Sequence, residues 1–191
     1  MRINSSIIKA YDIRGLYPSE INKETAFLLG RVYVAFLKKK LKKKRVALSV
    51  GRDLRFSSRE LALFFMQGAV DDGADITDLG EVTTPLNYFA VSHLGLDGGV
   101  MITASHNGPE YNGVKFMLRK GKEVLQIGKH HGLSLLPTLA RKKTKQVGGG
   151  TIQKKDIRKP YVDFLLRIVT FPKTIPFSRL KIVVDVSGGA A

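Results

Sequence analysis

The feature that most constrains the fold is an alternation of short apolar runs with longer stretches whose apolar residues recur at helical spacing. Apolar runs of this length are typical of buried strands. Strand–helix–strand alternation predicts an α/β sheet with helices on both faces. The expected strands are 45–50, 75–79 and 100–102, and residues 11–15 are expected to form a loop. The expected helices run from about Lys23 to Lys40 after an Asn22 cap, from a Ser57–Glu60 capping box to near Gly73, and from Thr84-Pro85 to Gly95.

The later part of the chain carries weaker signals. One helix is expected around 127–139, an amphipathic helix over 156–169, and a buried-type strand over 180–186. His130 and His131 are adjacent, and neighbours on a helix point about 100° apart, so they would not share a metal ion there. We expect both to be exposed.

A polar loop follows the strand at 100–102. Residues 103–109 read Thr-Ala-Ser-His-Asn-Gly-Pro, and the chain turns apolar again at 114–117, after Asn112-Gly113, a dipeptide typical of turns. Ser105 and His106 are therefore expected at a strand end, with Lys115 on the returning strand. A hydroxyl, an imidazole and an ammonium group together could perform phosphoryl or acyl transfer. By residue type alone an ordinary turn is the simpler interpretation, and both stand at this point.

The net charge of +16 is unusual for a 191-residue chain whose hydrophobic content of 43% is ordinary. Such a charge attracts nucleic acid, anionic membranes or phosphorylated small molecules. Two basic runs, 38–45 and 141–145, hold much of it. One interpretation is a non-catalytic module that binds nucleic acid or another polyanion. We favour a solvated helix end and a solvated loop, because cations complement a helix C-terminus and no aromatic residues are interleaved. We therefore expect no nucleic-acid partner.

Composition narrows the remaining classes. The absence of cysteine excludes disulfides and thiolate metal sites. No apolar run approaches the ~20 residues of a transmembrane helix, and the first residues lack a signal-peptide pattern. We expect a cytoplasmic protein without a membrane partner. No Gly-x-Ser-x-Gly elbow surrounds Ser105, which speaks against a serine hydrolase.

Three motifs carry a resemblance to a known family. Residues 103–107 (TASHN) with 111–116 (YNGVKF) resemble the active-site serine loop of the α-D-phosphohexomutase superfamily, and in particular its phosphomannomutase/phosphoglucomutase branch. Residues 9–15 (KAYDIRG) resemble the N-terminal signature of that branch, and 51–58 (GRDLRFSS) its second conserved loop. One departure is Gly108, which stands where the family usually has proline.

The resemblance implies a fold, a reaction and a set of site residues. The implied fold is a three-layer α/β/α unit with a mixed sheet, followed by the beginning of a second similar domain. Ser105 would carry a phosphoryl group that passes to a hexose phosphate, so that a bisphosphorylated sugar forms and phosphate moves between C1 and C6. Arg14 and Lys115 would supply positive charge and bind substrate, Tyr11 would contribute to binding, and His106 or Lys115 would handle the hydroxyl proton.

The resemblance also implies cofactors and supporting residues. Mg²⁺ would bind the phosphoserine at Ser105, with its remaining ligands outside this chain, and a hexose 1,6-bisphosphate would act as activator. A hexose phosphate is the expected partner. Arg52 and Asp53 would brace the serine loop without reacting.

The expected domains are 1–147 as the unit that carries the serine loop, 148–158 as a linker, and 159–191 as the start of a truncated second domain. The family's aspartate-rich metal loop, sugar-specificity loop and C-terminal phosphate-binding loop do not occur in the sequence. We therefore expect an N-terminal part of a mutase that is inactive alone.

Overall fold

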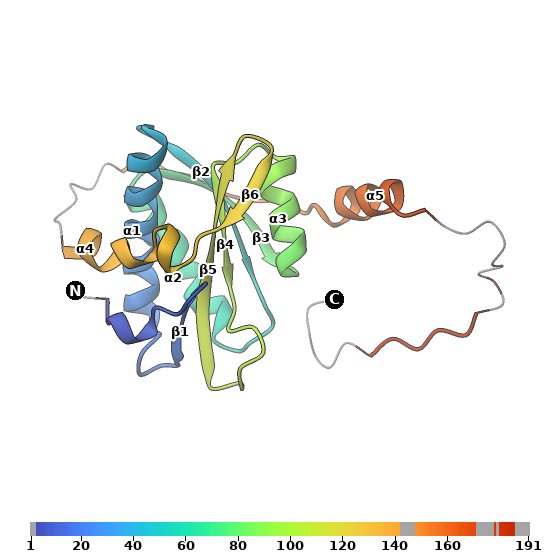
Figure 1. The fold of residues 1–191 in the computed structure, drawn as a ribbon, viewed down its shortest axis with the longest axis horizontal. Helices are drawn as coiled ribbons and strands as arrows, with labels where there is room; N and C mark the ends of the chain where they lie inside the picture. The colour runs from blue at the N-terminus through green and yellow to red at the C-terminus, as the bar shows by residue number, and fades with distance from the viewer. Residues whose placement is uncertain (1–2, 142–147, 171–177, 179, 186–191) are drawn as a thin grey trace.

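A computed structural model describes residues 3–141, 148–170, 178 and 180–185 of the chain. Figure 1 shows a twisted mixed sheet between helices. Within the described residues the sheet has seven strands in the order β1-β5-β4-β2-β3-β7, and β6 pairs with β5. Strands β4, β2, β3 and β7 are mutually parallel, whereas β5 is antiparallel to β1, β4 and β6. The strands are β1 Ile13–Leu16, β2 Val46–Arg52, β3 Ala74–Glu81, β4 Gly98–Ile102, β5 Tyr111–Lys120, β6 Glu123–Gln126 and β7 Ile152–Lys154.

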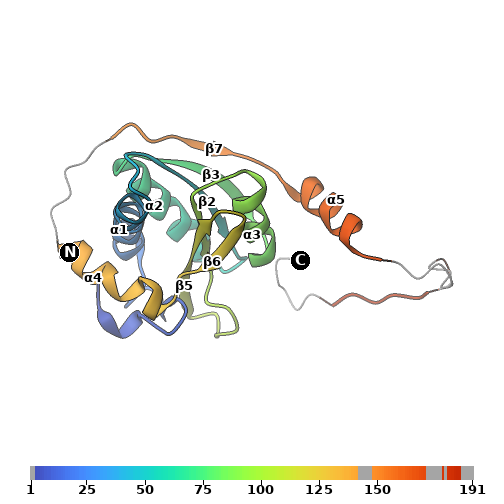
Figure 2. The same ribbon diagram turned by 45° about the horizontal axis from the view of Figure 1, so that its top comes forward.

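The helices form the two outer layers. Helices α1 (Lys23–Leu41) and α2 (Ser58–Asp71) pack on one face of the sheet, and α3 (Thr84–His93) packs on the other. Figure 2 shows these layers with α1 and α2 on one side of the strands and α3 on the other. The expected three-layer α/β/α fold with a mixed sheet is confirmed. Of two further helices, α4 (Leu136–Arg141) precedes β7 and α5 (Arg158–Ile168) follows it. Short 3₁₀ turns in the described residues occupy 5–7, 129–131 and 133–135.

Local sequence explains α1, which begins and ends as expected. The Asn22 side chain accepts a hydrogen bond from the Thr25 amide at 2.9 Å, which satisfies one free N–H of the first turn. The helix stops at Lys42, which has a left-handed backbone conformation. Helix α1 then packs closely on α2, because a Cβ at Gly30 would lie 2.1 Å from the Phe65 carbonyl oxygen.

The predicted Ser57–Glu60 capping box is wrong. Helix α2 does begin there, but Ser57 has helical backbone angles and makes no side-chain cap bond. Its hydroxyl instead accepts a hydrogen bond from the buried Asn112 amide at 2.7 Å. Glu60 accepts one from the Tyr17 hydroxyl at 3.0 Å. Both polar groups are committed to tertiary partners, which local sequence does not reveal.

Two further expectations near the serine loop are wrong for one reason. Asn112-Gly113 is no turn but lies inside β5, and 13–15, expected as loop, belong to β1. These segments pair with each other, with Arg14 opposite Gly113. A Cβ at Gly113 would lie 2.2 Å from the Ile13 carbonyl oxygen, so glycine serves close strand pairing here and not a turn.

The helix expected over 127–139 is largely wrong. Only Leu136–Arg141 is α-helical, while β6 and two 3₁₀ turns occupy the preceding residues. Gly132 has a φ of 140°, a conformation incompatible with a continuous helix. His130 and His131 are exposed, as expected.

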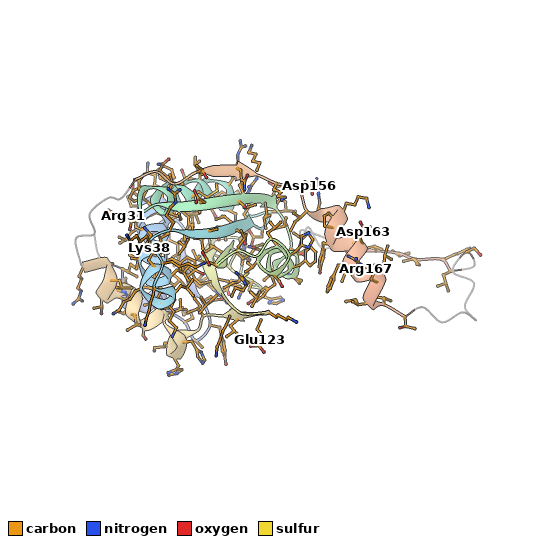
Figure 3. All side chains as sticks on the ribbon, turned by 90° about the horizontal axis from the view of Figure 1, so that it is seen from above. Arg31, Lys38, Glu123, Asp156, Asp163 and Arg167 are labelled. Atoms are coloured by element: carbon orange, nitrogen blue, oxygen red, sulfur yellow. The ribbon has the colours of Figure 1, made fainter. Side chains whose placement is uncertain are left out.

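After α4 the described chain continues with β7 and α5. The 148–158 stretch, expected as a linker, contributes β7, which pairs with β3. Helix α5 forms as predicted, and Tyr161 and Phe164 pack against Phe89 of α3. Figure 3 shows its Asp163 and Arg167 well away from the layers that bear Arg31 and Lys38.

Residues 180–185 are exposed and form no strand, contrary to expectation. A strand needs a partner for its backbone N–H and C=O groups, and the described residues place none beside this segment. Val186, the glycine-rich end at 187–191 and the second basic run beyond Arg141 lie outside the described residues.

Candidate active site

Sheet geometry brings the N-terminal motif to the serine loop. In the β1–β5 ladder Ile13 pairs with Val114, and one residue further in that register Asp12 lies across from Lys115. Side chains alternate along strands, so Asp12, Arg14 and Lys115 share one face while Ile13 and Val114 enter the core under α1 and α2. Residues about a hundred positions apart in the sequence thus become neighbours.

Asp12 is the centre of this group. Its side chain is 3% exposed, and its Oδ2 accepts hydrogen bonds from Arg14 Nη2 at 2.6 Å and from Lys115 Nζ at 2.9 Å. Arg14 also donates to the Asn107 side chain of the serine loop. Sequence reasoning did not single out Asp12. The available signal was its spacing of two from Arg14 beside a strand, which predicts a shared face.

Ser105 has an uncommon backbone conformation. Its φ of 58° lies in the left-handed region, which only a few per cent of non-glycine residues adopt. The Thr103 hydroxyl accepts a hydrogen bond from the Ser105 amide at 3.0 Å. Ser105 Oγ and His106 Nδ1 share a hydrogen bond of 3.0 Å, and both side chains are exposed. The hydroxyl therefore meets solvent with an imidazole against it, the arrangement that proton transfer to or from a serine requires.

Arg55 stabilises the serine loop through hydrogen bonds to its backbone. Its guanidinium donates to the carbonyl oxygens of Ser105 (3.1 Å), Asn107 (2.7 Å), Gly108 (2.5 Å) and Tyr111 (3.1 Å). Asp53 accepts from Arg55 Nε at 3.1 Å and so orients the guanidinium. Sequence reasoning missed Arg55, although it stands in the motif that was expected to brace the loop.

The expected brace residues separate in space. Asp53 supports the loop through Arg55. Arg52 instead faces the end of β3, where its nearest carboxylate oxygens are those of Glu81 at 3.5 Å and Asp78 at 3.9 Å.

A cavity of about 620 Å³ opens beside the Asp12 group. Arg14, Lys115, Asn107 and Tyr11 are among its lining residues, and Ser105 stands two positions before Asn107 on the adjoining loop. Its volume suits a ligand of sugar-phosphate size. Tyr11 is 70% exposed, and its carbonyl oxygen accepts a hydrogen bond from Gln126 at 2.8 Å, so the last residue of β6 positions this rim.

A second hollow, of about 970 Å³, lies between α2 and the ends of β3 and β7. Its lining includes Phe56, Leu63, Glu60, Asp78 and Lys154, drawn from the turn before α2 and from α2, β3 and β7 instead of the serine loop. The smaller cavity is the better site candidate, because it alone of the two collects residues from the serine loop and the N-terminal motif.

The described residues do not form a complete metal site. No three His, Cys, Asp or Glu side chains within them gather as a metal ion would require. Asp12 is already engaged by two cations. Ser105 can offer one oxygen, as a phosphoserine, to a hard cation such as Mg²⁺, so this part of the chain alone does not supply a complete set of metal ligands.

Among the residues that the structure describes, no helix is long and apolar enough to cross a membrane.

Comparison with known proteins connects this geometry to a family. Residues 5–129 match the family model described as "Phosphoglucomutase/phosphomannomutase, alpha/beta/alpha domain I". A phosphomannomutase of Salmonella montevideo is 36% identical over 98% of this chain, and one of Escherichia coli is 38% identical over 96%. The crystal structure of a phosphoglucomutase/phosphomannomutase family protein of Burkholderia thailandensis superimposes with a TM-score of 0.75 over 88% of this chain at 30% identity.

These matches cover only part of the compared proteins. The chain spans 40% of the Salmonella montevideo relative, 39% of the Escherichia coli relative and 37% of the Burkholderia thailandensis protein. The serine loop and the N-terminal motif both fall within the matched domain I region.

Proposed function

The chain belongs to the phosphoglucomutase/phosphomannomutase family, and from that premise we propose that it is the catalytic-serine part of a phosphohexomutase. The whole protein would move phosphate between C1 and C6 of a hexose phosphate through a phosphoserine and a bisphosphorylated sugar. The observation that carries the proposal is the link from the Ser105 loop through Asn107 and Arg14 to Asp12 and Lys115. It connects the loop that carries Ser105 and His106 to two cations that line the cavity.

Ser105 and His106 account for the covalent step. In the first transfer the bond between phosphorus and Ser105 Oγ breaks, and a bond forms from phosphorus to a sugar hydroxyl oxygen. The sugar hydroxyl gives its proton to solvent, and a proton is delivered to Ser105 Oγ. His106 Nδ1 lies 3.0 Å from that oxygen and can deliver this proton, or accept it in the return step.

Arg14 and Lys115 supply fixed positive charge to the transferred phosphoryl group. Such transfers depend on positioning and charge stabilisation more than on covalent help. Arg14 suits a phosphate oxygen because its guanidinium presents planar donors. Its Nε is buried and has no hydrogen-bond partner among the described residues. Tyr11 at the rim would contact the sugar.

Mg²⁺ and a hexose 1,6-bisphosphate complete the proposal. The ion would contact the phosphoserine at Ser105 and neutralise charge there, with its other ligands drawn from beyond this chain. The bisphosphate would phosphorylate an unmodified Ser105. We place the protein in the cytoplasm, where hexose phosphates occur, without membrane or nucleic-acid partners.

Two measurements test the proposal. The full-length protein should interconvert hexose 1-phosphate and 6-phosphate, and Ser105→Ala should abolish this, whereas Ser92→Ala, an exposed serine of α3, should not. Mass mapping should also find a phosphoryl increment of about 80 Da on Ser105. Interconversion that survives Ser105→Ala would refute the assignment.

A further inference from the structure

Asp12 occupies a place that the proposed mechanism leaves without a role. It is buried at the edge of the cavity, and one of its oxygens, Oδ2, contacts both Arg14 and Lys115. The two cations come from different strands, β1 and β5, and would repel each other without a shared anion. Because both nitrogens contact one oxygen, that atom keeps them close together.

The contact chain extends to the serine loop. Arg14 donates to Asp12 with Nη2 and to Asn107 with Nη1. Asn107 stands two residues after Ser105, and Arg55 holds its carbonyl oxygen at 2.7 Å. Asp12 therefore determines where Arg14 lies relative to the loop, as well as where Lys115 lies relative to Arg14.

We propose that Asp12 is a positioning residue for the phosphoryl transfer, an inference that rests on the proposed function. Its carboxylate holds Arg14 and Lys115 side by side against the serine loop and leaves the three groups with one net positive charge. Asp12 touches neither substrate nor the reacting atoms, and acts through the two cations.

An isosteric substitution separates position from charge. Asp12→Asn keeps the shape of the side chain and removes its negative charge. By charge alone, the variant should bind a phosphate dianion at least as well as the native protein, because the group gains a positive charge. By position, it should transfer phosphate poorly, because displacement of a catalytic cation by about 1 Å can cost about 100-fold in rate.

The kinetic arm uses the full-length protein. We expect Asp12→Asn to lower kcat about 100-fold while KM for the hexose phosphate rises less than about threefold. Asp72→Asn is the matched control, since Asp72 is also buried and pairs with an arginine, Arg31, at the end of α2. That variant should keep the native kcat. A native kcat in Asp12→Asn, or an equal fall in both variants, would overturn the inference.

The structural arm needs no activity and uses the 191-residue chain. In ¹⁵N–¹H spectra the Arg14 guanidinium should give resolved, slowly exchanging signals in the native chain and in Asp72→Asn, and should lose them in Asp12→Asn. Inorganic phosphate, titrated as a probe, should bind Asp12→Asn no more weakly than the native chain. Arg14 signals that persist in Asp12→Asn would overturn the inference.

Asp12→Glu covers the case in which Asp12→Asn does not fold. It retains the charge but displaces the carboxylate by one methylene, so it should fold and still lose at least about tenfold in kcat. A native kcat in Asp12→Glu would refute a positional role. If the native full-length protein shows no interconversion, the proposed function fails, and the Arg14 spectra still decide the role of Asp12.

Discussion

Arg55→Lys tests how much one side chain contributes to the conformation of the serine loop. Arg55 uses all five of its N–H donors: one for Asp53 and four for the carbonyl oxygens of Ser105, Asn107, Gly108 and Tyr111. These bonds oppose the cost of about 1–2 kcal/mol that a left-handed conformation imposes on a residue such as Ser105.

The magnitude follows from the donor count. Lysine keeps the charge but has three donors, so at least two of the five hydrogen bonds are lost. At about 1 kcal/mol for each bond, the native loop conformation loses about 2 kcal/mol relative to its alternatives. That corresponds to a fall of about 30-fold in the rate of transfer through Ser105.

The assay is the interconversion of hexose 1-phosphate and 6-phosphate by the full-length protein, with amide exchange of residues 103–109 measured in parallel. Arg119→Lys is the control, because Arg119 also donates to three backbone carbonyl oxygens, those of Leu96, Gly95 and Gly121, near the opposite end of β4. It should reduce thermal stability without slowing transfer. Native activity and native loop protection in Arg55→Lys would refute the argument.

Three further predictions concern the fold. Burial raises the pKa of Tyr33 far above its usual value, so the folded state excludes the phenolate. The free energy of unfolding should be constant below about pH 10 and should fall above it by up to about 1.4 kcal/mol per pH unit. Urea titrations of Tyr33→Phe should lack this fall above about pH 10. Gly113→Ala should cost about 2–3 kcal/mol in unfolding free energy, because the new Cβ would meet the Ile13 carbonyl oxygen; an unchanged urea midpoint would contradict the β1–β5 pairing. Phe89→Ala should raise the rate of amide hydrogen exchange across α5 about 10- to 30-fold while α1 stays protected, because it removes two aromatic contacts of about 0.5–1.5 kcal/mol each. Equal exchange rates in the variant and the native protein would show that other contacts hold α5.

The sequence predicts the layers well because their signals are local. Helix α1 has an Asn22 cap and a long apolar period, and β2 and β4 are nearly continuous apolar runs. Such patterns report burial of one face or of both. Each can be recognised without knowing what packs against it.

The errors of the sequence prediction occur where a residue's conformation depends on a partner far away in the sequence. Asn112-Gly113 has the composition of a turn, yet the glycine is needed because β5 lies too close to Ile13 of β1 to admit a Cβ atom. Ser57 has the composition of a cap, yet its hydroxyl binds Asn112. Both errors trace to β5, whose pairing with β1 joins segments about a hundred residues apart and leaves no local pattern.

The same dependence on distant partners explains which site residues the sequence revealed and which it did not. Ser105, His106, Arg14 and Lys115 were found through motifs, whereas Asp12 and Arg55 stand within those motifs and were given no role. What gives them one is a set of contacts across elements, from Asp12 to Lys115 and from Arg55 to four carbonyl oxygens. A motif identifies which residues are present, and the register of β1 against β5 determines which of them touch.

The large positive charge of the chain is not concentrated at the candidate site. The basic run at 38–45 lies at the end of α1 remote from β1, and a 19-residue helix spans about 28 Å. That length is several times the Debye length of about 8 Å at physiological salt, so the run contributes little to the potential at the cavity. Lys43 and Arg45 are instead paired with Asp97 and Asp75. The attraction of this cavity for a phosphate therefore depends on the cations that line it, which are Lys9, Arg14 and Lys115, and one carboxylate holds the last two together.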